Sequence, residues 1–148
     1  MASEIWHEAY ADMVDEEQTE YMLEKFLSPE SIGRQISEGT VYEFITEGGE
    51  DAGFIAYKKD GERLFLSKFY IKKEYRRSGL AAHSMRHIAD VAERMGLGSV
   101  YLTVNRGNRG AISAYEHMGF VASEDVDTDI GNGFFMYDHI MELRIRKN

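Results

Sequence analysis

The stretch Tyr70-Ile-Lys-Lys-Glu-Tyr-Arg-Arg-Ser-Gly-Leu-Ala81 reads as the end of a strand, a short basic turn and the start of a long helix. The first backbone N–H groups of a helix lack partners within it, and the helix dipole adds partial positive charge there. Small residues at Gly79 and Ala81 let the backbone close around an anion such as a pyrophosphate. The stretch therefore predicts a phosphate-binding turn, although small residues at a helix start also serve close packing alone.

Length and composition indicate one globular domain over residues 1–148. The chain is 43% hydrophobic and 29% charged, which is typical of a folded protein with its own core. The opening Met-Ala-Ser-Glu carries an acid where a signal peptide needs a basic and then an apolar run. No apolar run approaches the roughly 18 residues that a membrane span requires. We therefore expect a cytoplasmic protein with no membrane partner.

The chain contains no cysteine. This excludes disulfides, thiolate zinc sites and a cysteine nucleophile within these residues. A Gly-x-Ser-x-Gly elbow is also absent from the sequence, so a serine nucleophile of that type is unsupported. Direct group transfer between two bound substrates is the chemistry that remains open.

The net charge of −9 is unevenly distributed. Residues 1–62 hold 16 acidic and 4 basic side chains, whereas residues 63–148 hold 10 and 13. An anionic ligand on the second half and a cationic ligand facing the first half would fit this polarity. Solvation of helix faces explains the N-terminal acids as well. The acidic balance disfavours a nucleic-acid partner.

The pattern of apolar residues predicts a single α/β domain with a mixed sheet. Strand, helix and strand over residues 63–104 predict a right-handed crossover and a parallel strand pair. The turns at Asp60-Gly61 and Gly131-Asn-Gly133 predict hairpins. Helices are expected over residues 2–26 with a break near residue 14, from Ser28 to Gly39, and over 79–95 and 110–118. Strands are expected over residues 40–47, 52–58, 63–71, 99–104, 120–128 and 134–144.

A second motif follows about thirty residues after the first. It is Asn108-Arg-Gly-Ala-Ile-Ser-Ala-Tyr-Glu-His-Met-Gly-Phe120. Together with Arg76-x-x-Gly79-x-Ala81 it resembles the GCN5-related N-acetyltransferase (GNAT) family, closely over residues 63–120 and loosely elsewhere. Trp6-His-x-x-Tyr10, Glu20-Tyr-Met-Leu-Glu24 and Gly131-Asn-Gly-Phe-Phe135 are similar, much less specifically, to bacterial polyamine acetyltransferases.

The resemblance implies acetyl-CoA as the acyl donor and no metal. Pantetheine would lie in a gap of the sheet and pair with backbone of the third strand, where an N–H would stabilise the oxyanion. Asn108 would contact pantetheine, cap the helix, or do both. Tyr115 would be the general acid for the departing thiolate, against the alternative of a core tyrosine beside Ile112 and Met118. The implied coenzyme-binding residues are Phe69, Tyr70, Ile71, Arg76, Arg77, Ser78, Gly79, Leu80, Ala81, Ala82 and Asn108.

The expected reaction is direct acetylation of a primary amine, such as a polyamine or another small cationic amine. Acetylation of a protein N-terminus or lysine, and a non-catalytic acyl-CoA-binding module, are the alternatives. The general base is not assigned, because Glu43 and His7 are candidates by position only. The aromatic residues Trp6, Tyr10, Tyr21 and Tyr42 either line an amine pocket by cation–π contact or pack in the core.

Two features depart from the family pattern, and a pair of histidines raises the separate question of a metal site. Ala81 and Arg77 stand where glycine is common. Residues 2–8 are helical in pattern, where relatives open with a strand, so we expect the usual first strand to be lacking and residues 40–47 to form an exposed edge. The hypothesis is a homodimer joined there, or a segment covering it. His83 and His87 have metal-binding spacing, but without an obvious third ligand a solvated helix face is favoured.

Overall fold

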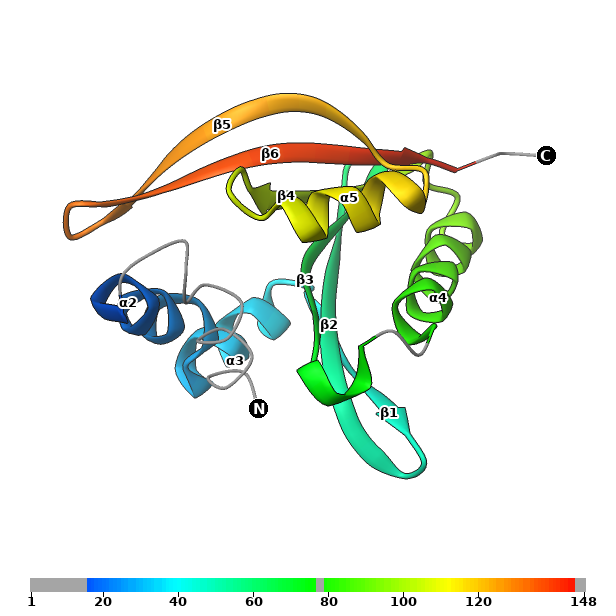
Figure 1. Cartoon of the computed structure of the whole chain (residues 1–148), viewed down its shortest axis with the longest axis horizontal. Helices are drawn as coiled ribbons and strands as arrows, with labels where there is room; N and C mark the ends of the chain where they lie inside the picture. The colour runs from blue at the N-terminus through cyan, green and yellow to red at the C-terminus, as the bar shows by residue number, and fades with distance from the viewer. Residues whose placement is uncertain (1–15, 77–78, 146–148) are drawn as a thin grey trace.

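The computed structural model describes residues 16–76 and 79–145 of the chain. Most of the expected elements are present within two or three residues of the predicted bounds, as Figure 1 shows. The helices are α2 (Glu16–Leu27), α3 (Pro29–Ser37), α4 (Leu80–Arg94) and α5 (Arg109–His117), with a 3₁₀ turn at Lys73–Tyr75. The strands are β1 (Val41–Glu47), β2 (Glu50–Asp60), β3 (Arg63–Ile71), β4 (Ser99–Asn105), β5 (Val121–Gly131) and β6 (Phe134–Arg144).

The six strands form one mixed sheet in the order β1-β2-β3-β4-β6-β5. Only β3 and β4 are parallel, and helix α4 joins them. The other neighbours are antiparallel, including the long β5–β6 hairpin that arches over the molecule in Figure 1. The α/β fold with a mixed sheet, predicted from the sequence, is therefore confirmed.

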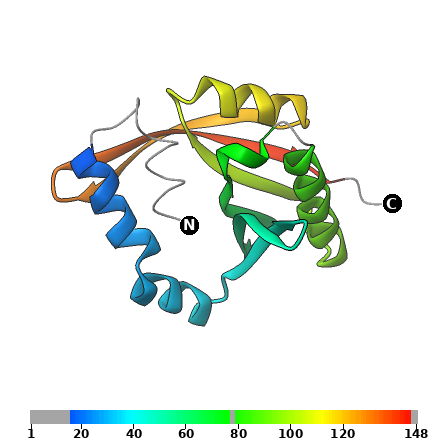
Figure 2. The ribbon, with the colours of Figure 1, turned by 60° about the horizontal axis from the view of Figure 1, so that its bottom comes forward.

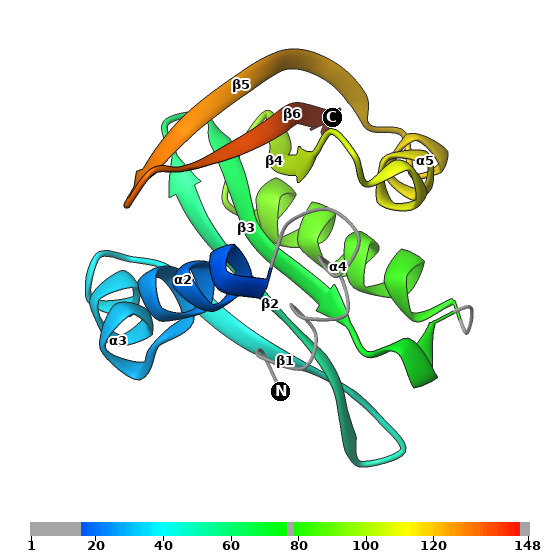
Figure 3. The same ribbon diagram turned by 60° about the vertical axis from the view of Figure 1, so that its left-hand side comes forward.

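Helices cover both faces of the sheet. Figure 3 shows α4 and α5 on one side of β3, with α2 and α3 on the other. The larger core lies under α4 and α5, with Ile88, Leu64 and Met141 almost fully buried. A smaller core under α2 and α3 is centred on Met22 and Phe54. The sheet thus separates two apolar layers, one under α4 and α5 and one under α2 and α3.

Helix α2 is tied to the far end of the β5–β6 hairpin, as Figure 2 shows. The Tyr21 hydroxyl donates to the Ile130 carbonyl at 2.7 Å, and the Lys25 ammonium donates to the same oxygen. The Gln18 amide donates to the Phe135 carbonyl at 2.8 Å. These bonds join segments that lie more than a hundred residues apart in the sequence.

Local sequence signals explain where several elements begin. Ser28 caps α3 by accepting from the Ser31 N–H at 3.2 Å, and Pro29 occupies the first turn, as the sequence predicted. In α4 the buried stripe runs through Ser84, Met85, Ile88 and Ala92. Met95, the last residue of the helix expected over 79–95, is the C-cap of α4 and is 44% exposed.

Strand β1 forms one edge of the sheet that the structure describes, and Phe44 on it is 69% exposed. This agrees with the expected exposed edge at residues 40–47, while the homodimer stays a prediction. The expected helical start at residues 2–8, and with it the lack of a first strand, falls outside the described residues. None of the described helices is long and apolar enough to cross a membrane.

Candidate active site

The sheet is split between its third and fourth strands. Strand β3 pairs with β4 only from Arg63 to Phe65, opposite Ser99 to Tyr101. On its other side β3 continues to pair with β2 as far as Ile71. Beyond Phe65, the β3 backbone on the β4 side therefore has no strand partner within the described sheet. Backbone N–H and C=O groups in such a position can bind an extended ligand as an added strand.

A β-bulge at Ser67 sets which side chains of β3 face each layer. Ala56 pairs with Lys68 and Tyr57 with Leu66, so Ser67 is the extra residue, and its hydroxyl donates to the Ala56 carbonyl at 3.2 Å. Side chains alternate along a strand, and one extra residue reverses the alternation. The larger core therefore receives Leu64 and Leu66 before the bulge but Phe69 and Ile71 after it, whereas Lys68 and Tyr70 face α2 and α3.

Close approach of β2 to β3 holds the end of this strand. A side-chain carbon placed on Gly53 would lie 2.0 Å from the Tyr70 carbonyl oxygen, so only glycine fits there. Gly53 pairs with Ile71, and Lys72 donates its N–H to the Ala52 carbonyl at 2.7 Å. The part of β3 from Phe69 to Ile71, beyond its pairing with β4, is thus held against β2 on its other side.

The predicted phosphate-binding turn connects β3 to α4. Arg76 folds back, and its Nε donates to the Ile71 carbonyl at 3.1 Å. Gly79 precedes the helix with φ of +81°, a left-handed conformation that glycine adopts without strain. It has no side chain to cap α4, so the first-turn N–H groups of Leu80, Ala81 and Ala82 have no partner within the helix. Arg77 and Ser78, also expected in this turn, lie outside the described residues.

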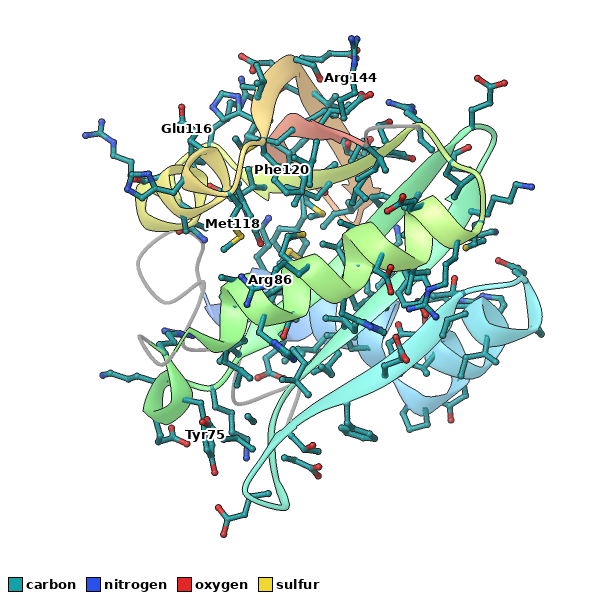
Figure 4. All side chains as sticks on the ribbon, turned by 90° about the vertical axis from the view of Figure 1, so that its right-hand side faces the viewer. Tyr75, Arg86, Glu116, Met118, Phe120 and Arg144 are labelled. Atoms are coloured by element: carbon teal, nitrogen blue, oxygen red, sulfur yellow. The ribbon has the colours of Figure 1, made fainter. Side chains whose placement is uncertain are left out.

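Tyr115 lies on the last turns of α5 and faces the end of β3. Its half-buried ring meets the Phe69 ring edge-on, with centroids 6.4 Å apart and an interplanar angle of 84°. A second contact joins it to Phe120 at 5.6 Å. Met118 and Phe120 lie between α5 and α4 in Figure 4, and they support the helix from the core side. The Tyr115 ring thus lies beside the part of β3 that extends beyond its pairing with β4.

Asn108 caps α5. Its side-chain oxygen accepts from the Ala111 N–H at 3.1 Å. This is one of the two roles expected from the sequence. The amide oxygen keeps a second lone pair and the amide nitrogen carries two N–H donors, so the cap leaves both atoms able to contact pantetheine.

A pocket of about 370 Å³ lies on the face of the sheet under α2 and α3. Residues from both sides of the split line it, including Ser67 and Tyr70 of β3 and Thr103 of β4. Phe26 of α2 and Met136 of β6 contribute apolar walls. The pocket therefore borders the place where β3 and β4 separate, on the face opposite α4 and α5.

One wall of this pocket contains a buried cation, Lys68, which is 8% exposed. Its ammonium donates to Gln35 Oε1 at 3.0 Å and lies 5.3 Å from the centre of the Tyr42 ring. The Tyr42 hydroxyl donates to the same Gln35 oxygen at 2.5 Å. Burial lowers the pKa of Lys68 to about 8 and raises the pKa of Tyr42 to about 12, because each charged form loses hydration.

Another wall contains a buried acid, Asp138 on β6, which is 5% exposed and sits opposite Asn105 of β4. No hydrogen bond or ion pair joins its carboxylate to another described residue. Burial raises the pKa of Asp138 to about 6, although the positive charges of Arg106 and His139 act in the opposite direction. Sequence reasoning missed this residue. The signal was its period-two spacing after Phe134 and Met136, which places the acid on an inward face.

The other polar candidates from the sequence lie elsewhere. Glu43 Oε1 lies 3.2 Å from His87 Nε2. Both residues and His83 line a separate depression of about 230 Å³ between β1 and α4. The described residues contain no group of three potential metal ligands around these histidines or elsewhere. Glu43 is thus remote from the pocket that contains Lys68 and Asp138.

The described aromatic candidates, Tyr21 and Tyr42, both make contacts within the protein. Tyr21 packs on Phe134, with ring centroids 5.2 Å apart, and belongs to the smaller core. Tyr42 contacts the ammonium of Lys68 within the protein. Trp6, His7 and Tyr10 lie outside the described residues.

Comparison with known proteins agrees with this geometry. The family model described as "Acetyltransferase (GNAT) family" matches residues 2–120. Streptothricin acetyltransferase of Streptomyces lavendulae is 36% identical over 81 residues, which cover 52% of this chain and 43% of that protein. The [Ribosomal protein bS18]-alanine N-acetyltransferase of Escherichia coli K12 is 29% identical over 76 residues, 51% of each chain. The matches thus span about half the length of these curated relatives.

A solved structure matches over nearly the whole chain. It is the PaiA N-acetyltransferase of Thermoplasma acidophilum in complex with coenzyme A. The two structures superpose with a TM-score of 0.80 at 25% sequence identity, covering 97% of this chain and 87% of that one.

Proposed function

Because the chain belongs to the acetyltransferase (GNAT) family, we propose that it transfers an acetyl group from acetyl-CoA directly to a primary amine. The single observation that carries the proposal is the release of β3 from β4 after Phe65, with the Tyr115 ring facing Phe69 across the split. The relative solved with coenzyme A supports the choice of donor. The absence of cysteine from the sequence favours direct transfer, since no enzyme thioester can form.

In this proposal the coenzyme binds along the free side of β3. The backbone of Phe69, Tyr70 and Ile71 would pair with the pantetheine amides as a strand would. One backbone N–H would donate to the thioester oxygen as negative charge develops on it. Such a donor costs no reorganisation, because the bulge and the contact at Gly53 already fix the strand.

The turn before α4 would bind the pyrophosphate. First-turn N–H groups from Leu80 to Ala82 and the helix dipole attract an anion. The ammonium groups of Lys72 and Lys73 add positive charge in an otherwise acidic protein. Arg76 is folded onto Ile71 O and orders the turn from the strand side.

Tyr115 would act as the general acid. The amine nitrogen forms a bond to the carbonyl carbon, the carbon–sulfur bond breaks, and the phenol gives its proton to the departing thiolate. The phenolate then takes up the proton that the nitrogen loses as the amide forms. A thiolate with a pKa near 8.5 leaves more readily when it is protonated. The edge-on contact with Phe69 orients the ring toward this region.

A small amine is favoured over a polypeptide as the acceptor. The pocket beside the split holds about 370 Å³, which suits a small molecule. The acidic first half of the chain led us to expect a polyamine, but the pocket favours it less. The described charged residues of the pocket are Lys58, Lys68 and Asp138, so positive charges outnumber negative ones. A protein N-terminus is the second candidate, because one relative is named as a ribosomal-protein alanine acetyltransferase.

Steady-state kinetics with acetyl-CoA and a panel of amines tests the proposal. Tyr115→Phe should lower kcat by about 100-fold or more and leave the KM for acetyl-CoA within about threefold, since it removes only a proton donor. Tyr137→Phe, on an exposed tyrosine of β6, is the matched control and should retain full activity. An unchanged kcat in Tyr115→Phe would remove Tyr115 from its role. Coenzyme binding without turnover of any amine would select the non-catalytic module.

A further inference from the structure

Two buried charges of opposite sign line the same pocket without meeting. Lys68 on β3 is 8% exposed and Asp138 on β6 is 5% exposed. No ion pair joins them, and neither is bridged to another charged residue of the part of the chain that the structure describes. The only described partners of the Lys68 ammonium are a neutral amide oxygen and the Tyr42 ring.

Such an arrangement is costly for folding alone. A charge removed from water without a partner of opposite sign destabilises the native state, and buried charges in proteins are normally paired. The Lys68 and Asp138 side chains lie on different strands that the split holds apart, with β4 between them in the sheet order. A ligand in the pocket can pair with both at once if it carries both charges itself.

The rest of the lining fits a short chain between two charged ends. Phe26, Ile130 and Met136 are apolar, whereas Ser67, Thr103 and Thr128 offer hydroxyl groups. A second cation, Lys58, lines the pocket and is half-buried. The two lysines outnumber the single acid, so a ligand with two or more positive charges and no negative one is disfavoured by repulsion.

We infer that the acceptor is an amino carboxylate, a small molecule with a primary amine near Asp138 and a carboxylate near Lys68. The inference rests on the proposed function and names the substrate class of the same site. The Asp138 carboxylate accepts a proton from the substrate ammonium, and the free amine then attacks the thioester carbon. The Tyr115 phenol protonates the departing coenzyme sulfur, and the resulting phenolate takes up the second proton that the nitrogen loses as the amide forms. Two protons therefore leave the substrate ammonium, one to Asp138 and one to the coenzyme thiol by way of Tyr115.

The test uses matched sets of unbranched substrates. Each ω-amino carboxylate, with one to five methylene groups, is compared with the diamine and the alkylamine of equal length. Wild-type protein should acetylate the best amino carboxylate with a kcat/KM about 10- to 100-fold above its matched alkylamine, and further above its diamine, because a charge-assisted hydrogen bond is gained. Equal values for the three compounds would overturn the inference.

Two variants assign the ends of the substrate. Lys68→Met should remove the preference for the carboxylate, so that the ratio of kcat/KM for the amino carboxylate to kcat/KM for the matched alkylamine falls to about one. Asp138→Asn should lower kcat for all amines and shift the acid limb of the pH profile, while coenzyme binding is retained. The controls make the same charge changes on exposed residues of β2, as Lys59→Met and Asp51→Asn, and should keep wild-type behaviour. A carboxylate preference that survives in Lys68→Met would contradict the assignment.

Failure of the proposed function is distinguishable from failure of this inference. If no amine is acetylated, calorimetry with coenzyme A and each ω-amino carboxylate decides separately. Binding by wild-type protein that weakens about tenfold or more in Lys68→Met supports the pocket assignment even without turnover. No binding of any amino carboxylate, with coenzyme A bound normally, overturns it.

Discussion

The ring of Tyr115 on α5 meets the ring of Phe69 on β3 edge-on across the split in the sheet, with centroids 6.4 Å apart. This ring contact joins the second sequence motif, which lies on α5, to β3, the strand that precedes the first motif. Phe69 reaches this position only because Ser67 is an extra residue in β3, which turns Phe69 toward the α4–α5 layer.

Phe69→Leu tests the contact. It keeps an apolar side chain in the core but removes the ring edge that orients Tyr115, so we expect kcat to fall about 3- to 30-fold with little change in the KM for acetyl-CoA. Steady-state kinetics measures both constants. The same change at Phe135, an exposed ring on β6, should leave kcat unaltered. A fall in thermal stability with unaltered kcat would give Phe69 a packing role alone.

Gly79→Ala tests the turn before α4. A side-chain carbon at this position meets no atom within 4 Å, but the φ of +81° is strained for alanine by about 1 kcal/mol. Relief of that strain would move the first-turn N–H groups. We expect the KM for acetyl-CoA to rise about 5- to 50-fold, measured against Gly110→Ala, which meets no atom either and has no positive φ. An unaltered KM would mean that the turn does not grip the coenzyme.

Gly53→Ala tests the backing of β3. The added carbon would lie 2.0 Å from the Tyr70 carbonyl oxygen, so the two strands must separate. We expect a loss of about 3 kcal/mol or more in the free energy of unfolding, measured by urea denaturation. Gly33→Ala in α3 meets no atom within 4 Å and should instead stabilise the protein by about 0.5 to 1 kcal/mol. Equal effects of the two substitutions would contradict the close approach of the strands.

Asp138→Asn tests the burial of an unpaired acid. The folded-state pKa of about 6 lies above the ordinary value of about 3.9, so the folded protein holds a proton that the unfolded chain releases. The contribution of Asp138 to stability is therefore favourable below about pH 4 and is lost as the pH rises toward 6. We expect the variant to be more stable than wild type by about 1 to 3 kcal/mol at pH 7.5, with no gain at pH 4. Denaturation at both pH values, with Asp51→Asn as the control, measures this difference.

The pH dependence of turnover supplies an independent test of the same residue. If Asp138 accepts the substrate proton, kcat/KM should fall tenfold per pH unit below about pH 6, where the carboxylate becomes protonated. The positive charges of Arg106 and His139 act on Asp138, and Lys58 and Lys68 line the same pocket. His139, whose Nδ1 lies 2.5 Å from Asp125 Oδ1, is the neighbouring group to control for, and His139→Gln should keep the acid limb. A limb that persists in Asp138→Asn would assign the proton to another group.

The order of the helices and strands was predictable because local signals agree with the tertiary contacts. Arg63–Ile71 and Phe134–Arg144 have the bounds expected from apolar runs and turn glycines. The cap at Asn108 follows from its place before a helix. The two motifs also indicated the GNAT family, which the family model over residues 2–120 confirms. Their site roles, above all that of Tyr115, remain proposals.

The pocket that we propose for the acceptor amine could not be predicted from the sequence. Lys68 and Asp138 show why. Lys68 stands one residue after Ser67, and its face depends on a bulge that no residue type in β3 announces. Asp138 lies seventy residues later, on a strand that reaches the same pocket only through the sheet order. The sequence by itself determined the elements, the two motifs and the family, because each depends on residues close together in the chain. The presence of two buried, opposite charges in one pocket beside the split depends on strand register and the bulge, which only the tertiary structure decides.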